Sequence, residues 1–77
     1  MKYKIKCFIK SGGRRNLIED VVNFDKKPTK DEVENIIDNE TNILIPHKHK
    51  FKNIVSEICN CDFGVENWGV LSITNPT

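Results

Sequence analysis

Two short patterns in the chain contain imidazole and thiol side chains, which are ligands that zinc prefers in proteins. These patterns are His47-x-His49 and Cys59-x-Cys61. If residues 46–60 form one helix, about 18 Å separates the two pairs along its axis, whereas the ligands of one zinc lie within about 4 Å of each other. We therefore predict no zinc site within one chain and no cofactor. A metal ion bound between two subunits is the alternative that this spacing leaves.

No residue pattern typical of catalysis accompanies these residues. Cys7 lies in an alternating row of apolar residues, where a cysteine is more often a small buried hydrophobe than a nucleophile. Asp31, Glu34 and Asp38 lie in a predicted helix, where such acids suit the N-terminal dipole and an outward, solvated face. No partner for acid–base chemistry stands beside them, so we predict that the chain is not an enzyme.

A basic loop is predicted over residues 11–16, where two glycines precede Arg14 and Arg15. A phosphate-binding loop normally leads into the N-terminus of a helix, but this loop of several residues joins two predicted strands. It is therefore interpreted either as a solubilising turn or as a basic hairpin tip that contacts phosphates without specificity.

Lysine and apolar side chains alternate over the first ten residues. Alternation with a period of two is typical of a strand that buries one face, because successive side chains leave opposite sides of the pleat. The odd-numbered side chains from Tyr3 to Ile9 are predicted to face a core. The opposite, outward row is Lys4, Lys6, Phe8 and Lys10.

The return strand is predicted over residues 17–24, and its register decides which acids are buried. One register places Asp20 and its alternating neighbours beside the core row and buries one acid. A slip of one residue would bury Glu19 and Asn23 instead, together with Leu17 and Val21. Because a one-residue slip turns every side chain to the other face and buried polar groups are costly, we predict the first register. Glu19 then lies on the outward face, where it can pair with a lysine.

Two helices are predicted between the second and third strands. The segment Thr29-Lys30-Asp31-Glu32 matches a capping box with Thr29 as N-cap, and this helix is expected to end between residues 40 and 42. Residues 43–45 are either an apolar linker or a last helical turn. The second helix is predicted over residues 46–60, because it carries apolar side chains at helical spacing, namely Phe51, Ile54, Val55 and Ile58.

The third strand is predicted over residues 65–74, and its two rows differ in composition. The row that contains Leu71 and Ile73 offers more aliphatic side chains, so it is predicted to face the core. Trp68 and Val70 then share the outward face with Phe8, Leu17 and Val21. An incorrect assignment of these faces would make Trp68 part of the core.

These elements predict an α+β fold of the order ββααβ in one domain over residues 1–77. Two amphipathic helices must bury their apolar stripes against a sheet, so both are placed on one face of it. A right-handed crossover brings the third strand beside the first. The result is a three-stranded antiparallel sheet of order 2-1-3, with the lysine-rich strand at its centre.

The composition limits the class of protein. A chain of 77 residues with 38% hydrophobic and 30% charged residues supports one thin core, and no apolar run reaches the roughly 20 residues that span a bilayer. Three cysteines do not form a disulfide framework. We therefore predict a cytoplasmic protein that does not bind membranes. Alanine and glutamine are absent while isoleucine, lysine and asparagine are frequent, which indicates an AT-rich genome such as that of a low-GC bacterium or its phage.

The charges are divided along the chain. Residues 1–18 carry a net +6, residues 19–45 carry −5, and the rest sum to zero. The two blocks can neutralise each other in the fold or leave a basic surface. Aromatic side chains among lysines on an open sheet suit either a protein interface or a single-stranded nucleic acid. The predicted partner-binding residues are Lys4, Lys6, Phe8, Lys10, Arg14, Arg15 and Trp68.

The function predicted from this surface is that of a small regulatory protein that binds another protein through the open sheet face or an edge strand. A phage or mobile-element inhibitor of a host system would suit the size of the chain and the AT-rich codons that its amino-acid composition indicates. One alternative is a nucleic-acid-binding module that uses the basic strand and the hairpin tip. The other is a structural homodimer.

Overall fold

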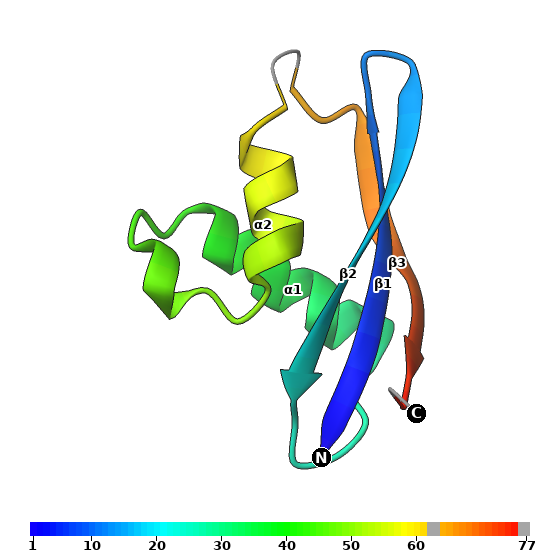
Figure 1. Cartoon of the computed structure of the whole chain (residues 1–77), viewed down its shortest axis with the longest axis vertical. Helices are drawn as coiled ribbons and strands as arrows, with labels where there is room; N and C mark the ends of the chain where they lie inside the picture. Colours follow the sequence, from blue (N-terminus) through cyan, green and yellow to red (C-terminus); the bar gives the residue numbers. More distant parts are fainter. Residues whose placement is uncertain (62–63, 76–77) are drawn as a thin grey trace.

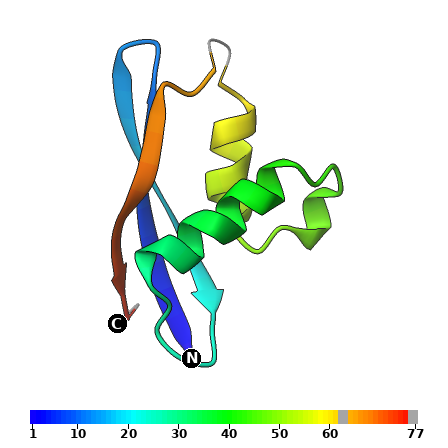
Figure 2. The same cartoon turned by 180° about the vertical axis from the view of Figure 1, so that it is seen from behind.

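The computed structural model describes residues 1–61 and 64–75. Three strands form an antiparallel sheet of order β2-β1-β3, and both helices lie on one side of it (Figures 1 and 2). The predicted ββααβ architecture is therefore confirmed. The elements are β1 (Lys2–Ser11), β2 (Arg14–Asn23), α1 (Lys30–Thr41), a 3₁₀ turn (Pro46–Lys48), α2 (Lys52–Cys59) and β3 (Asn67–Thr74).

The β1–β2 hairpin closes more tightly than predicted. Ser11 pairs with Arg14, so only Gly12 and Gly13 lie between the strands. Both glycines have positive φ, 58° and 78°. Two-residue turns of this kind match the right-handed twist of the flanking strands, and glycine adopts them without steric cost. The prediction of a loop over residues 11–16 was therefore wrong, because Arg14 and Arg15 belong to β2.

The predicted register of β1 and β2 is confirmed. Ile5 pairs with Asp20, and Cys7 pairs with Ile18. The odd-numbered side chains of β1 from Tyr3 to Ile9 are all buried, and Asp20 is the one acid of β2 that is buried with them. The core also contains Val22, Val33, Ile37, Phe51, Ile54, Val55, Val70 and Ile73.

A β-bulge in β3 overturns the predicted faces of the residues before Leu71, whereas Ile73 faces the core as predicted. Ser72 pairs with Lys6 and Val70 pairs with Cys7, so Leu71 is an extra residue between them. An extra residue shifts the alternation of every residue beyond it. Val70 is consequently buried, and Trp68 pairs with Ile9 and packs against the core. The placement of Trp68 and Val70 on the outward face was wrong.

Helix α1 follows the prediction, whereas α2 is shorter than expected. The Thr29 hydroxyl accepts the Glu32 N–H at 3.1 Å, as expected for the N-cap, and α1 ends at Thr41. The helix predicted over residues 46–60 is instead divided into the 3₁₀ turn and α2. Two carboxylates from elsewhere in the chain hold the point at which α2 begins.

These carboxylates belong to Asp20 of β2 and Glu40 of α1, which are both buried. Glu40 accepts the N–H of Phe51, the N-cap of α2, at 2.9 Å. Asp20 accepts the N–H groups of Asn53 and Ile54 at 3.3 and 3.0 Å. The first N–H groups of a helix have no partner within it and favour negative charge, so the two acids anchor α2 to both β2 and α1.

Candidate functional site

The candidate site is the outer face of the sheet, which we define as the solvent-facing side of β1, β2 and β3. No helix in the described part of the chain covers this face (Figures 1 and 2). Leu17 is 60% exposed and Val21 is 51% exposed. Half-buried lysines and Phe8 of β1 lie between the two outer strands. The face therefore combines apolar and basic groups.

Phe8 lies at the centre of the outer face, between groups from both neighbouring strands. The Arg15 guanidinium of β2 lies over the Phe8 ring, with its carbon 4.9 Å from the ring centroid. On the other side, a Cβ added to Gly69 of β3 would lie 3.1 Å from Cε1 of Phe8. The absence of a side chain at Gly69 lets the ring lie close to β3. The ring thus packs between the Arg15 guanidinium and the backbone of Gly69, and this packing positions it without a bound partner.

Two acids from the neighbouring segments neutralise part of the basic charge, and one of them, Glu19, was predicted to do so. Lys4 Nζ lies 4.0 Å from a Glu19 carboxylate oxygen, and Lys10 Nζ lies 4.0 Å from Glu66 Oε2. These side chains are between 38% and 51% exposed, and exposed ion pairs at this distance contribute little to stability. Lys6 makes no ion pair with the residues that the structure describes. The outer face therefore retains a positive net charge.

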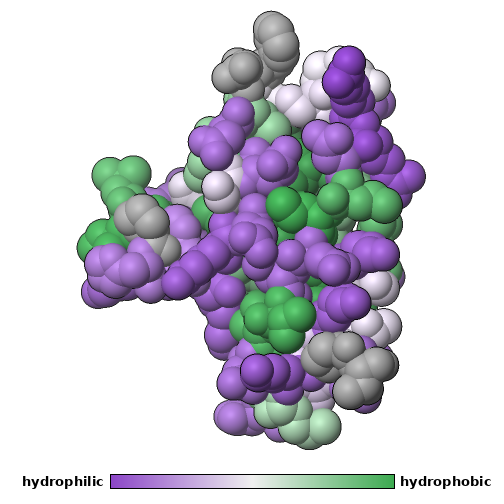
Figure 3. Space-filling view, viewed as in Figure 1, coloured by the Kyte–Doolittle hydropathy of each residue, from purple (hydrophilic) through white to green (hydrophobic). Residues whose placement is uncertain are grey.

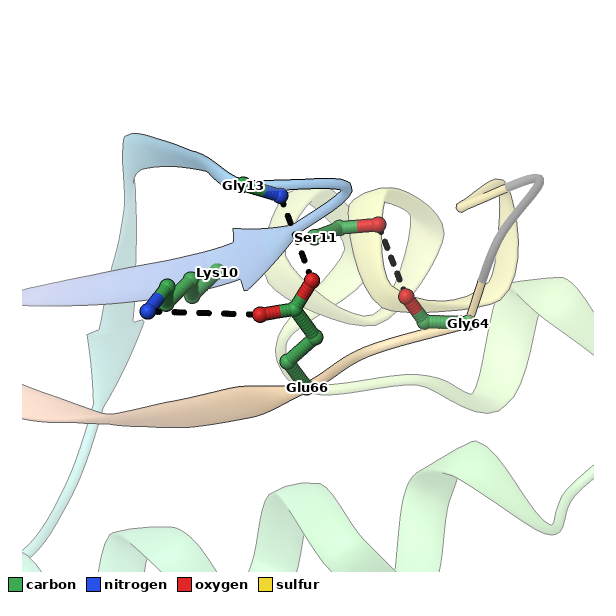
Figure 4. A network of polar contacts seen from close by, with 5 residues as sticks. All are labelled: Lys10, Ser11, Gly13, Gly64 and Glu66. Atoms are coloured by element: carbon green, nitrogen blue, oxygen red, sulfur yellow. Dashed lines mark hydrogen bonds and ion pairs between the residues drawn. The ribbon is translucent and has the colours of Figure 1, made fainter.

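The hairpin tip is tied to the start of β3 by side chains that form a polar network (Figure 4). Glu66 accepts the Gly13 N–H at 3.2 Å and also pairs with Lys10. The Ser11 hydroxyl donates to the Gly64 carbonyl at 2.7 Å. A loop that binds phosphate needs free backbone N–H groups, and the Gly13 N–H is already taken by a carboxylate. Arg14 and Arg15 remain exposed beside it.

The structure thus brings together five of the seven predicted partner-binding residues. The four residues of β1 lie on the outer face with Arg15 beside them, whereas Arg14 and Trp68 belong to the rows on the core side of the sheet. Gly69, two residues before Leu71, is a weak signal for a bulge in this strand, but it does not specify which residue is the extra one. Glu34, predicted to point to solvent, instead accepts the Val70 N–H at 3.0 Å.

A second exposed apolar group lies on the connection between α1 and α2. Leu44 is 92% exposed, and Ile43 and Ile45 beside it are 38% and 43% exposed. They project from the body of the molecule, where Figure 3 shows apolar surface at the tip of the connection. Between this connection and α2 lies a cavity of about 530 Å³ whose lining includes Leu44, His49 and Cys59. The sequence identified this run only as a linker or a helical turn.

The histidines and cysteines do not lie as the predicted long helix required. Because the helix is broken, His49 and Cys59 line the same cavity rather than opposite ends of one helix. His49 Nε2 lies 2.8 Å from the Ile43 carbonyl oxygen, and the Cys61 thiol donates to the Glu57 carbonyl at 3.2 Å. Within residues 1–61 and 64–75, no three His, Cys, Asp or Glu side chains are grouped closely enough to hold a metal ion.

Cys7 is fully buried beneath the sheet. Desolvation raises the pKa of its thiol to about 12, and the nearby carboxylates of Glu34 and Asp20 act in the same direction. A nucleophilic cysteine must be a thiolate. The thiol of Cys7 is therefore protonated at neutral pH, which agrees with its interpretation as a small core residue.

Comparisons with known proteins found no relative of this chain. No family model matches the chain, and no curated protein or solved structure matches it. No helix among the described residues is long and apolar enough to cross a membrane. Functional inference therefore rests on the geometry of the outer face.

Proposed function

We propose that this chain is a small, non-enzymatic regulatory protein that binds another protein through the outer face of its sheet. The observation that supports this most strongly is the exposure of Leu17 and Val21, 60% and 51%, beside a Phe8 ring that is already held in position. Large apolar groups within a polar rim are typical of protein interfaces. Lys4, Lys6 and Lys10 surround them, so the partner surface is expected to be apolar at its centre and acidic at its edge.

Occupation of a partner's surface is the action that such a domain can perform without catalytic residues. A role as an inhibitor of a host system, encoded by a phage or mobile element, fits the small size and the composition of the chain. Both the inhibitory role and the phage or mobile-element origin are proposals about the biological setting, and the proposed binding face does not depend on them.

Binding of single-stranded nucleic acid is the second candidate, favoured by the exposed Arg14 and Arg15 and by Lys6, which pairs with no acid among the described residues. Nonspecific binding of this kind combines phosphate neutralisation with bases stacked on bare aromatic rings. Trp68 is turned toward the core, and the Phe8 ring already lies beneath Arg15. The face thus offers charge with little stacking surface, and we place this candidate behind protein binding.

The proposed function is tested by affinity capture from a nuclease-treated lysate of the organism that encodes the chain. Wild type is compared with Lys6→Glu and with Phe8→Ala, and Leu44→Ala serves as control because it removes an exposed apolar side chain far from the sheet. A protein captured by wild type and by the control is then purified and titrated. We expect Lys6→Glu and Phe8→Ala each to weaken its binding at least about tenfold.

Circular dichroism must show that all variants are folded. If Lys6→Glu and Phe8→Ala bind the purified partner as tightly as wild type does, the outer face is not the binding surface. A shift assay with a single-stranded oligonucleotide at low salt separates the second candidate. Binding that falls steeply with added salt and with Lys6→Glu, without any protein partner, would favour nucleic acid.

A further inference from the structure

The two edges of the sheet differ in what covers them. Edge strands present unpaired N–H and C=O groups that can template the addition of another strand. At the β3 edge, Glu34 of α1 accepts the Val70 N–H at 3.0 Å, and α1 passes close to β3 in both views (Figures 1 and 2). The β3 edge is therefore partly covered. Helix α2 packs against the core side of β2, where Asp20 accepts its first N–H groups, but no described backbone group bonds to the outward edge of β2.

The hydrogen-bond pattern of the hairpin identifies the groups that β2 leaves open. The Met1 and Phe24 backbones exchange two hydrogen bonds, each of 2.9 Å. In an antiparallel pair, residues that exchange both bonds alternate with residues whose groups point outward. Counting from Phe24, the even-numbered residues of β2 bond to β1. The residues whose N–H and C=O groups point away from the sheet are Arg15, Leu17, Glu19, Val21 and Asn23, and all five are exposed.

A groove runs beside this edge, with room for another chain. Its volume is about 630 Å³, and it is lined by Lys6, by three residues of β2 and by three residues of α2. Figure 3 shows apolar side chains gathered between α2 and the strands in this region. The lining from β2 is Leu17, Ile18 and Glu19, and the lining from α2 is Asn53, Ser56 and Glu57.

We propose that the occupant of the β2 edge is β2 of a second copy of this chain, paired antiparallel about a two-fold axis at Leu17. In this register Leu17 lies opposite Leu17 of the second copy, and Arg15 lies opposite Glu19 of the second copy. Each of these pairs uses backbone groups that point outward in both copies. The edge is thus complementary to itself in charge, in apolar contact and in hydrogen bonding, as a closed two-fold interface requires.

Neighbouring registers lack this match. An axis at Glu19 would place two glutamates opposite each other, and like charges directly opposite destabilise a strand pair. An axis at Ile18 would place Leu17 opposite Glu19 and leave Arg15 opposite Val21. The Lys4–Glu19 pair spans 4.0 Å between half-exposed side chains, so it leaves Glu19 available for Arg15.

The dimer would form one continuous six-stranded sheet with all helices on the same side. Because residues that pair in this register lie on the same face, the outer faces of the two copies become contiguous. Two Phe8 sites would then lie on one surface. This inference does not depend on the proposed function, because it concerns the edge of β2 and a different partner.

The test is a charge swap followed by mass measurement in solution. We expect wild type to sediment at about twice 8.9 kDa and to dissociate on dilution. Arg15→Glu and Glu19→Arg should each weaken dimerisation about tenfold, because each reversal sets like charges opposite each other twice in a symmetric dimer. The double variant, with both reversals, should restore the wild-type dissociation constant.

A backbone variant and a surface control complete the experiment. Leu17→Pro removes an outward N–H while it keeps the bonds of β2 to β1, so it should give a monomer that is folded by circular dichroism. Leu44→Ala should dimerise as wild type does. A wild type that stays monomeric at millimolar concentration overturns the proposal, and so does a dimer that the single reversals do not weaken or the double reversal does not restore.

Discussion

At the scale of single residues, the Asp20 carboxylate has the largest structural consequence. It lies on the core face of β2 and accepts two N–H groups at the start of α2. Burial raises its pKa above the ordinary value of 3.8, with a smaller contribution from the Glu40 charge, while the hydrogen bonds from Ile54 and Asn53 oppose the rise. The cost of burying the Asp20 carboxylate is thus opposed by its hydrogen bonds to the first N–H groups of α2.

We predict that Asp20→Ala lowers the free energy of unfolding by about 2 kcal/mol, because buried helix N–H groups lose their acceptor.

Asp20→Asn keeps the shape of the side chain and removes its titration. Because the folded pKa of Asp20 is raised, the native state holds this proton more tightly than the unfolded state does, and the contribution of Asp20 to stability falls as pH rises from 3.8 through the raised value. Urea unfolding of wild type and Asp20→Asn at several pH values measures this difference, and a difference that grows with pH would contradict the assignment.

At the scale of elements, the β1–β2 hairpin determines where the basic groups lie. Its two-residue turn extends both strands and places Arg15 over Phe8 instead of in a mobile loop. Glu66 then ties the turn to the segment that enters β3. The geometry of one tight turn therefore decides the arrangement of the outer face.

We predict that Gly13→Ala destabilises the protein by about 1 kcal/mol, because φ is +78° at this position. A Cβ there meets no atom within 4 Å, so the cost comes from the backbone and not from a clash. Gly13→Asn should cost less, since asparagine tolerates positive φ better. Thermal unfolding checks both variants. A shift of roughly 4–8 °C is expected for alanine, and an equal shift for asparagine would argue against backbone strain.

At the scale of the whole molecule, one layer of helices covers one face of one sheet. The molecule measures about 35 × 25 × 20 Å, and its fully buried side chains include Ile5, Cys7 and Ile9 of the central strand. A small domain with a thin core buries little apolar surface apart from that around its central strand, so few contacts can be lost before the whole domain unfolds. Exposure of Cys7 therefore requires the sheet and helices to separate.

We predict that the Cys7 thiol reports global unfolding. In a Cys59→Ser, Cys61→Ser variant it is the one remaining thiol, and its burial and its pKa of about 12 should make labelling at neutral pH at least about a hundredfold slower than in urea. The labelling rate at rising urea concentration should follow the unfolding curve seen by circular dichroism. Rapid labelling of the native protein would show that the sheet opens locally around β1.

The sequence alone was sufficient for features that depend on neighbouring residues. The alternation of β1 specifies its buried row, Thr29 and Glu32 specify the start of α1, and the cost of burying two polar groups selects the β1–β2 register. From these features the architecture and most of the outer face could be predicted.

Tertiary structure alone decided the features that depend on groups distant in the chain. Helix α2 begins where Asp20 and Glu40 supply acceptors, and the bulge at Leu71 turns Trp68 toward the core. Neither is specified by the local pattern, because each is set by partners that folding brings together from other elements. The metal-like pattern of histidines and cysteines shows the same limit, since its geometry depended on a helix that the buried acids shorten.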